Sequence, residues 1–222
     1  MEKHIVKVLK TTYVTHNVKR FTVEKPAGYT YTPGQATDVS INKPSLEEEL
    51  RPFTFTSLTN ADHLEFTIKI YTGHNGVTEK LAAINAGDEL ILHEVFGAIA
   101  YKGPGVFIAG GAGITPFIAI LRMLKAENKL AGNTLLFANR TESDIILKNE
   151  LTDMLGDNFV NVLEHSADDN SPAKYIDAEL LKKYIDKNAH YYICGPDKFI
   201  EKMQEHLHNL GIAASQIVIE ES

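Results

Sequence analysis

The feature that most constrains this chain is the uncharged stretch between Lys102 and Arg122. Its length and hydropathy alone would suit a membrane span of about 20 apolar residues. Three breaks inside it argue otherwise: Gly103-Pro104-Gly105 interrupts the backbone, Gly110-Gly111-Ala112-Gly113 is typical of a tight loop, and Thr115-Pro116 is a typical helix start. The stretch therefore predicts a short buried strand over 106–109, a glycine loop and then a helix.

A strand, a glycine loop and a helix together suit the binding of a phosphate group. Glycine lets the backbone approach a ligand closely, and the free N–H groups and positive dipole end of a helix start attract an anion. A plain strand-to-helix turn can carry the same glycines. The loop alone leaves both interpretations open.

Composition narrows the function classes. With 222 residues, 44% of them apolar and 23% charged, the chain is expected to form one large or two compact globular domains. The net charge of −7 and the lack of a basic cluster argue against nucleic acid and anionic membrane surfaces as partners. The amino-terminal segment has no long apolar run of the secretory type, which predicts a cytoplasmic protein.

Cysteine and histidine usage bears on redox chemistry. The single cysteine, Cys194, excludes an intrachain disulfide, a zinc ribbon and an intrinsic iron–sulfur cluster, since each needs several thiolates. The nine histidines show no metal-ligand spacing, so no metal site is expected. Any redox chemistry would need an organic cofactor.

The two halves of the chain have different patterns. Residues 1–102 contain short β-type runs at 5–9, 18–23, 36–41, 51–57, 64–71 and 88–92, with one short helix near residue 80 and a polar loop over 42–50, which predicts an antiparallel barrel. Residues 103–222 alternate expected strands at 106–109, 134–138, 160–164, 191–194 and 217–219 with helices at 116–125, 145–154, 178–185 and 198–210. That alternation predicts an α/β domain with a doubly wound parallel sheet.

Several short motifs occur in the order found in one enzyme family. They are Pro33-Gly34-Gln35, Arg51-Pro52-Phe53-Thr54, Gly76-Val77-Thr78, Gly87-Asp88, the loop from Gly110 to Pro116, and Cys194-Gly195-Pro196, followed by an acidic residue near the end. With these motifs the chain resembles the ferredoxin/flavodoxin–NAD(P)H reductase family over nearly its whole length. The resemblance implies an FAD-binding barrel followed by an NAD(P)-binding domain.

The resemblance assigns the flavin half of the site to the barrel. Arg51 would clamp the flavin pyrophosphate, Phe53 would stack on the isoalloxazine ring, and Thr54 would bring a hydroxyl near the hydride-accepting N5 atom, with Pro52 between them. Taken alone, Arg51 would more often be a surface arginine, and Phe53 would more often belong to the barrel core. The family commonly has Tyr where this chain has Phe53, so the phenolic hydroxyl is missing.

Two further barrel segments join the implied flavin site. Gly76, Val77 and Thr78 would place a helix start against the pyrophosphate, although Thr78 alone could be a simple N-cap. The backbone around Lys69, Ile70 and Tyr71 would line the same site.

The resemblance assigns the pyridine nucleotide to the second domain. Gly110, Gly111, Ala112 and Gly113, with Thr115 and Pro116, would hold NAD(P)H, and Cys194, Gly195 and Pro196 would lie beside the nicotinamide. Cys194 would position the ring and not act as a nucleophile; a lone Cys is also often a small buried hydrophobe. Glu220 would orient the nicotinamide or relay protons, unless it belongs to a solvated tail. The aromatic that covers the flavin face in many relatives is missing after Ile219.

Coenzyme choice has conflicting signals. Arg140, together with Ser166, could bind the 2′-phosphate of NADPH, whereas Asp168 and Asp169 suit the free ribose hydroxyls of NADH. The balance slightly favours NADH.

The resemblance implies a monomeric flavoprotein oxidoreductase that takes hydride from NAD(P)H onto FAD and passes electrons to a separate soluble carrier such as flavodoxin or ferredoxin. Two alternatives stay open: a reductase component of an oxygenase or a reductase of free flavin or ferric chelates, and a nucleotide- or flavin-binding module without turnover.

Overall fold

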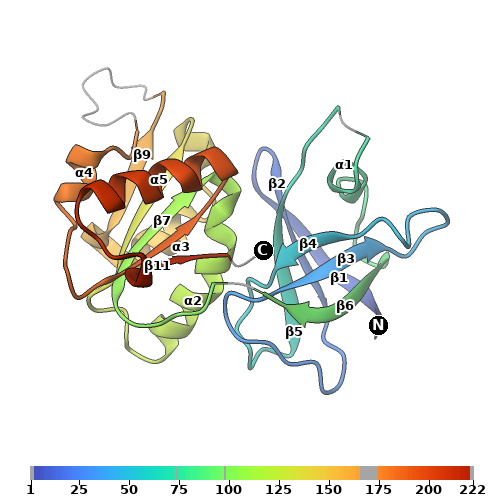
Figure 1. Cartoon of the computed structure of the whole chain (residues 1–222). Helices are drawn as coiled ribbons and strands as arrows, with labels where there is room; N and C mark the ends of the chain where they lie inside the picture. Colours follow the sequence, from blue (N-terminus) through green and yellow to red (C-terminus); the bar gives the residue numbers. More distant parts are fainter. Residues whose placement is uncertain (1–2, 74, 98, 166–174, 221–222) are drawn as a thin grey trace.

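The computed structural model describes residues 3–73, 75–97, 99–165 and 175–220. The first half of the chain forms one sheet and the second half forms another, with helices packed around the second (Figure 1). In chain order the strands are β1 His4–Thr15, β2 Val18–Glu24, β3 Ala36–Ile41, β4 Arg51–Thr54, β5 His63–Lys69, β6 Glu89–Phe96, β7 Gly105–Gly110, β8 Thr134–Asn139, β9 Phe159–Leu163, β10 His190–Cys194 and β11 Ile217–Ile219. The α-helices are α1 Val77–Leu81, α2 Thr115–Ala126, α3 Lys148–Leu155, α4 Ala178–Lys182 and α5 Asp197–Asn209. Short 3₁₀ turns occur at η1 Gly111–Ile114, η2 Glu142–Asp144, η3 Gly156–Asn158 and η4 Ala214–Gln216.

The amino-terminal sheet is antiparallel, in the order β4-β3-β6-β1-β2-β5. It curls until its two outer strands meet, where Phe55 pairs with Phe66 and the Thr56 N–H donates to the Glu65 carbonyl oxygen at 2.8 Å. Apolar side chains from β1, β2, β3, β5 and β6 fill the interior together with α1. The expected antiparallel barrel is confirmed.

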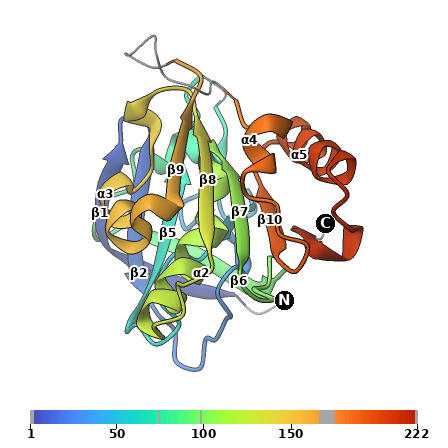
Figure 2. The ribbon, with the colours of Figure 1, turned by 90° about the vertical axis from the view of Figure 1, so that its left-hand side faces the viewer.

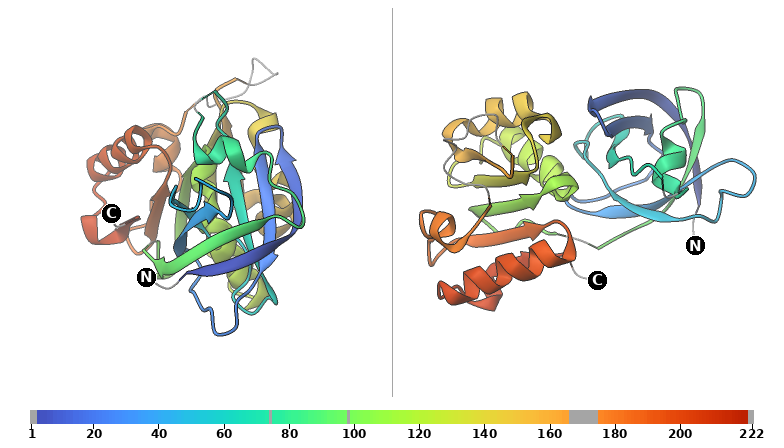
Figure 3. Two further views of the ribbon diagram at one scale, coloured as in Figure 1. Left: turned by 90° about the vertical axis from the view of Figure 1, so that its right-hand side faces the viewer. Right: turned by 90° about the horizontal axis from the view of Figure 1, so that it is seen from above.

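The carboxy-terminal sheet is parallel throughout, in the order β11-β10-β7-β8-β9. Figure 2 shows β9, β8, β7 and β10 in sequence across the sheet, and Figure 3 shows its layers from above, with α2 and α3 on one face and α4 and α5 on the other. The strand order reverses between β7 and β10. This doubly wound arrangement confirms the expected α/β domain, and its switch point is where such sheets bind ligands.

Some element bounds differ from the expectation. β1 continues to Thr15 because it pairs first with β6 and then with β2, although its residues beyond Leu9 lose the apolar alternation. The helix expected from residue 145 begins at Lys148, because Ile145 and Ile146 are buried before the turn and Leu147 has a φ of 53°. α4 ends at Lys182 and not at residue 185.

The uncharged stretch between Lys102 and Arg122 crosses the core of the second domain. Its strand β7 is fully buried, and α2 buries seven of its residues against the sheet. Within the described part of the chain no helix is long and apolar enough to cross a membrane.

Candidate functional site

The glycine loop follows β7 at the switch point of the parallel sheet. Gly110 is the last residue of β7, Gly111 to Ile114 form the turn η1, and Thr115 begins α2 with Pro116 in its first turn. The opposite side of the switch point is the end of β10, where Cys194 is followed by Gly195 and Pro196. The two predicted nucleotide motifs therefore lie against each other.

Two glycines of the loop are required by its geometry. Gly111 has a φ of 53°, in the left-handed region, and nothing lies within 4 Å of the place where a Cβ would stand. At Gly113 a Cβ would lie 2.3 Å from the Cys194 carbonyl oxygen, closer than real contacts allow. The first glycine leaves open space in front of the loop, and the second lets the loop pack directly on the end of β10.

A cleft of about 1340 Å³ runs along this edge of the sheet and continues to the barrel. It brings together these predicted site residues: Lys69, Ile70, Tyr71, Gly110, Gly111, Ala112, Gly113, Arg140, Cys194, Gly195 and Pro196. Ile70 is buried, whereas Tyr71 is 49% exposed, with the Lys69 ammonium 5.6 Å from its ring centre. One wall thus comes from the barrel and the other from the parallel sheet.

The other predicted flavin-site residues lie outside the lining of this cleft. Arg51 and Pro52 are exposed on β4, Thr54 is half-buried, and Phe53 packs partly against the barrel core. The Arg51 guanidinium donates to the Leu50 carbonyl oxygen at 2.6 Å. β4 ends on the side of the barrel that faces the second domain (Figure 1).

The segment from Gly76 to Thr78 starts a helix of five residues. Gly76 occupies the N-cap position and no side chain caps the helix, so Thr78 is not the N-cap. Val77 is buried in the barrel core. At the start of α2, the Thr115 hydroxyl donates to the Ala112 carbonyl oxygen at 3.1 Å, which ties it to the glycine loop.

Cys194 ends β10, and Glu220 follows the adjacent parallel strand β11. Burial raises the pKa of the Cys194 thiol to about 12, and the negative charge of Glu220 adds to the shift, while a backbone hydrogen bond from Gly195 opposes it. Glu220 itself is exposed and directly follows β11. The thiol is therefore protonated at neutral pH, which suits a positioning role and not a nucleophilic one.

One face of α5 lines the cleft, although none of the sequence motifs includes it. Lys198, Lys202 and His206 are spaced four residues apart and so lie on one helix face. The Phe199 ring packs against Gly110: a Cβ added at Gly110 would lie 3.1 Å from the ring. The spacing of these three basic residues was readable from the sequence, but nothing in it shows that this face borders a ligand cleft.

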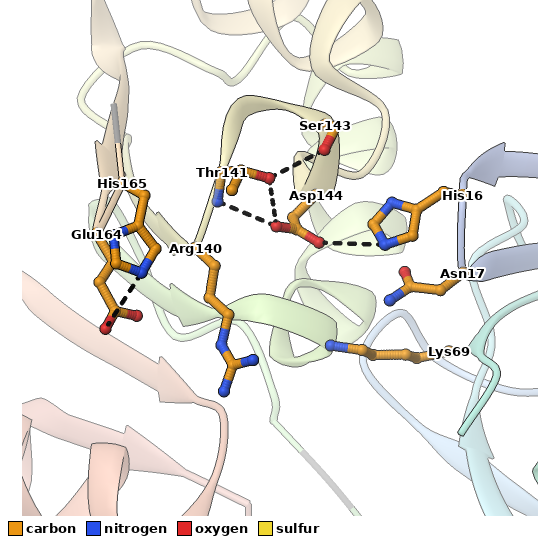
Figure 4. Close-up of a pocket in the computed structure, with 9 residues that line it drawn as sticks. All are labelled: His16, Asn17, Lys69, Arg140, Thr141, Ser143, Asp144, Glu164 and His165. Atoms are coloured by element: carbon orange, nitrogen blue, oxygen red, sulfur yellow. Dashed lines mark hydrogen bonds and ion pairs between the residues drawn. The ribbon is translucent and has the colours of Figure 1, made fainter. Parts of the chain in front are cut away.

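A smaller polar pocket of about 580 Å³ joins the cleft beyond Arg140 (Figure 4). Its lining residues are His16, Asn17, Lys69, Arg140, Thr141, Ser143, Asp144, Glu164 and His165. The Asp144 carboxylate accepts hydrogen bonds from the Thr141 N–H and hydroxyl at 3.0 and 2.6 Å, and His16 Nε2 lies 3.8 Å from its other oxygen. Ser166, Asp168 and Asp169, which were considered for coenzyme choice, lie outside the described residues.

The cleft fits a dinucleotide. Its lining contains the basic residues Lys69, Arg140, Lys198, Lys202 and His206 against the acidic residues Asp144, Glu164 and Asp177, although the whole chain is acidic. Among the described residues, neither amide atom of Asn139 in the cleft wall has a hydrogen-bond partner. A bound pyrophosphate needs hydrogen-bond donors and positive charge. The cleft supplies both, with the backbone of the glycine loop, the basic lining residues and the unpaired polar atoms of Asn139.

Comparison with known proteins identifies both halves. The oxidoreductase NAD-binding domain family matches residues 107–205, and the FAD-binding domain family matches residues 3–104. The chain belongs to the ferredoxin/flavodoxin–NAD(P)H reductase family. It carries the FAD-binding and NAD(P)-binding domains of an FAD-dependent NAD(P)H oxidoreductase.

Two similar proteins are matched over different shares of their own length and are named for different partners. The reductase component of propane 2-monooxygenase from Rhodococcus jostii (strain RHA1) is 30% identical, over 87% of this chain and 56% of the relative. NADH-cytochrome b5 reductase 1 from Homo sapiens is 26% identical, over 90% of this chain and 79% of the relative. The chain thus spans little more than half of the propane monooxygenase component.

The same fold occurs in a solved reductase structure. A ferredoxin NADP⁺ reductase from Neisseria gonorrhoeae, with FAD and NADP bound, has a TM-score of 0.84, with 98% of this chain and 97% of that chain covered and 18% sequence identity.

Proposed function

We propose that this reductase takes hydride from NAD(P)H onto FAD and passes the electrons singly to a separate carrier protein such as flavodoxin or ferredoxin. The observation that carries the proposal is the single cleft in which barrel residues Lys69 to Tyr71 face the glycine loop and Cys194 at the switch point. Bound FAD would supply the hydride-accepting ring and the one-electron steps. The protein's share is to bind both nucleotides, align them and exclude water.

Within this proposal the barrel holds the flavin and the parallel sheet holds the pyridine nucleotide. Arg51, Pro52, Phe53 and Thr54 on β4, with Gly76 to Thr78 at the start of α1, would bind FAD. Gly110 to Pro116 would hold the pyrophosphate of NAD(P)H, and Cys194 with Glu220 would position the nicotinamide. The domain division at residues 102 and 103 stays a prediction, as do the monomeric state and the cytoplasmic location.

A second candidate is supported by the comparisons. The Rhodococcus relative is named as an oxygenase reductase component, which favours an oxygenase component as the electron acceptor. The human relative is named for cytochrome b5, a third kind of one-electron carrier. All three acceptors share the same reductive half of the reaction, and they differ in the surface that must dock near the flavin.

We further propose that NADH is the preferred coenzyme. The support is the pair of carboxylates, Asp144 and Glu164, in the polar pocket beside Arg140. Negative charges there repel a 2′-phosphate and suit free ribose hydroxyls. Arg140 acts against this preference, so the discrimination is expected to be modest.

The decisive experiment is anaerobic mixing of the FAD-loaded protein with NADH or NADPH, with the flavin absorbance followed in time. Bleaching by either nucleotide, faster with NADH, is expected. The reduced protein is then offered flavodoxin, ferredoxin, cytochrome b5, free flavin and a ferric chelate in parallel. A protein that takes up no FAD, or whose flavin neither nucleotide bleaches, would refute the proposed activity. Transfer to free flavin or ferric chelates alone would refute the carrier-protein assignment.

The assigned flavin clamp has its own test. Replacing Arg51 by Ala removes charge-assisted hydrogen bonds and is expected to weaken FAD binding about 10–100-fold, measured by fluorescence titration. Arg140→Ala is the matched control, because Arg140 lies in the nucleotide wall and should leave FAD affinity unchanged. Equal FAD affinity in wild type and Arg51→Ala would remove Arg51 from the flavin site.

A further inference from the structure

The helix that begins at the glycine loop carries a half-buried arginine two turns further on. The side chain of Arg122 is 17% exposed and lies on α2 next to the fully buried Leu121. Its Nε and Nη2 atoms donate to the two Glu150 carboxylate oxygens at 2.5 and 2.9 Å. Glu150 is on α3, in the same domain. This half of the contact fixes the guanidinium plane within the parallel domain.

The remaining donor of Arg122 reaches across to the barrel. Its Nη1 atom donates to the Thr56 carbonyl oxygen and to a Glu65 carboxylate oxygen, both at 2.6 Å. Glu65 is 11% exposed and also accepts from the Thr56 hydroxyl at 2.8 Å. Arg20 Nε on β2 lies 3.7 Å from the other Glu65 oxygen. One guanidinium therefore joins two carboxylates that belong to different domains.

The barrel end of this contact is itself held tightly. The Thr56 N–H donates to the Glu65 carbonyl oxygen at 2.8 Å, and the Glu65 N–H donates to the Ser57 hydroxyl at 2.9 Å. The Tyr31 hydroxyl bonds the same Ser57 oxygen at 2.8 Å. The segment around Thr56 that Arg122 contacts is therefore held by hydrogen bonds to the barrel, where its two outer strands meet.

Both ends of the contact lead directly to the proposed ligand sites. Arg122 is seven positions after Thr115 on one rigid helix, and that helix starts at the loop that would hold the pyridine nucleotide. Thr56 is two residues after Thr54, which would lie beside the flavin. A relative motion of the domains that carries α2 away from the barrel would break the Arg122 contact to Thr56 and Glu65.

We propose that Arg122 is a positioning residue for hydride transfer, because its contacts to Glu150, Glu65 and Thr56 fix the nucleotide wall of the cleft relative to the flavin wall. The inference rests on the proposed hydride transfer. Such a step requires the reacting atoms to be held at near-contact distance, and a misplacement of about 1 Å can cost about 100-fold in rate. The arginine does not touch either ligand and acts through the two segments that it joins.

The planar fork explains why an arginine suits this place. Two parallel hydrogen bonds to Glu150 leave one amine of the guanidinium pointed at the barrel, and a lysine ammonium could not keep both directions. Burial alone would lower the pKa of Arg122, but the hydrogen bonds with Glu150 and the charge of Glu65 outweigh it and raise the pKa. The positive charge is therefore permanent.

The test compares variants of the FAD-loaded full chain. Glu65→Gln weakens the hydrogen bond between Arg122 and the barrel. Arg122→Lys keeps the positive charge but loses the planar guanidinium that binds Glu150 and the barrel together. Tyr191→Phe is the matched control, because the Tyr191 hydroxyl accepts from the Asp186 N–H at 2.8 Å inside the parallel domain and spans no interface. Four quantities are measured: FAD affinity, NADH affinity, the rate constant of flavin reduction at saturating NADH, and the long-wavelength absorbance that reports stacking of the nicotinamide on the flavin.

In both Glu65→Gln and Arg122→Lys we expect the reduction rate constant and the stacking absorbance to fall, the rate by about 10–100-fold, with nearly unchanged FAD and NADH affinities. The control should keep the wild-type rate. A wild-type rate in Glu65→Gln, or a loss that follows nucleotide affinity instead of the rate constant, would overturn the proposal. If Arg122→Lys fails to fold, Glu65→Gln carries the test alone.

Small-angle X-ray scattering of the same proteins without nucleotide gives a readout that does not depend on turnover. If the Arg122 contact fixes the domains, Glu65→Gln and Arg122→Lys should show a broader distribution of interdomain distances than wild type and Tyr191→Phe. Identical distributions would overturn the proposal that Arg122 fixes the domains, even if activity changed. If wild-type flavin is not reduced by either nucleotide, the proposed function fails, and the scattering still decides whether Arg122 fixes the domains.

Discussion

Cys194 shows how the environment of one residue separates two possible roles. Its thiol lies at the end of β10, where the chain passes the glycine loop within contact distance of Gly113. A reactive cysteine needs a lowered pKa from nearby positive charge or a helix start. In this protein burial is the larger cause and the carboxylate of Glu220 the smaller one, and both raise the pKa of the Cys194 thiol. This environment suits the proposed role of Cys194, a neutral, polarizable surface beside the nicotinamide.

The shifted thiol predicts slow alkylation. With a pKa of about 12 in place of an ordinary 9.0, the thiolate fraction at neutral pH falls about 1,000-fold, since each pKa unit is a factor of ten. Iodoacetamide labelling of the folded protein, followed by mass spectrometry, should be slower than labelling of the urea-unfolded chain by a factor of that order. The difference should shrink as the pH rises toward 12. Equal rates near neutral pH would contradict the assigned environment.

Single residues also mark the limit of the sequence analysis. Motif residues such as Arg51 and Cys194 stand out in the sequence because the order of their motifs along the chain matches a family. Arg122 was noted only as the end of an uncharged stretch, since its partners Glu65 and Glu150 are distant in sequence. Partners separated by 57 and 28 residues leave no local pattern to detect.

At the scale of elements, the close contact between the glycine loop and the end of β10 defines the proposed nucleotide site. β7 and β10 are adjacent and parallel, so the turns that follow them leave the same edge of the sheet. The loop can lie on the Cys194-Gly195 backbone only where side chains are missing. The close contact therefore depends on the glycines at both strand ends.

Replacing Gly113 by Ala should disturb this contact. The new Cβ would lie 2.3 Å from the Cys194 carbonyl oxygen, a backbone atom that cannot rotate away. We expect a loss of about 1–3 kcal/mol in the free energy of unfolding, a fall in Tm of about 2–12 °C by calorimetry, and weaker NADH binding. Gly76→Ala, with open space and a φ of −87°, is the control and should change Tm less. An unchanged Tm in Gly113→Ala would mean that the loop is free to move off β10.

Element bounds were less predictable than element types. Alternation identified the half-buried strands, but β1 runs six residues past Leu9 because strand pairing with β2 holds it, and pairing is not written in a local pattern. Ile145 and Ile146, which lie in the turn before α3, fit the expected helix because both residues are apolar and precede a helical pattern. In each case tertiary contacts decided the outcome.

For the whole molecule, the Arg122 contact links stability to pH. Burial would raise the pKa of Glu150, but its hydrogen bonds and the charge of Arg122 outweigh burial and lower the pKa below the ordinary 4.5. A lowered folded-state pKa contributes stability above the unfolded pKa, and that contribution is lost as the pH falls through the folded value.

Acid unfolding should therefore depend on Glu150. Urea unfolding between about pH 3 and pH 7 is expected to show the stability gap between wild type and Glu150→Gln shrinking as the pH drops below about 4.5. Glu142→Gln is the control, because Glu142 pairs with Lys148 on the surface, where ion pairs contribute little. A gap that stays constant with pH would show that Glu150 contributes through packing and not through its charge.

The continuity of each sheet has a consequence for how the protein is made. All six barrel strands lie before residue 97, and all five parallel strands lie after residue 104. During synthesis the barrel can close while the ribosome is still translating the second domain, because domains fold as units from the amino terminus. Glu65 would then lack its Arg122 partner until α2 is synthesised, and would keep only its barrel partners Thr56 and Arg20. The nascent chain would thus be competent to take up flavin before its nucleotide half exists.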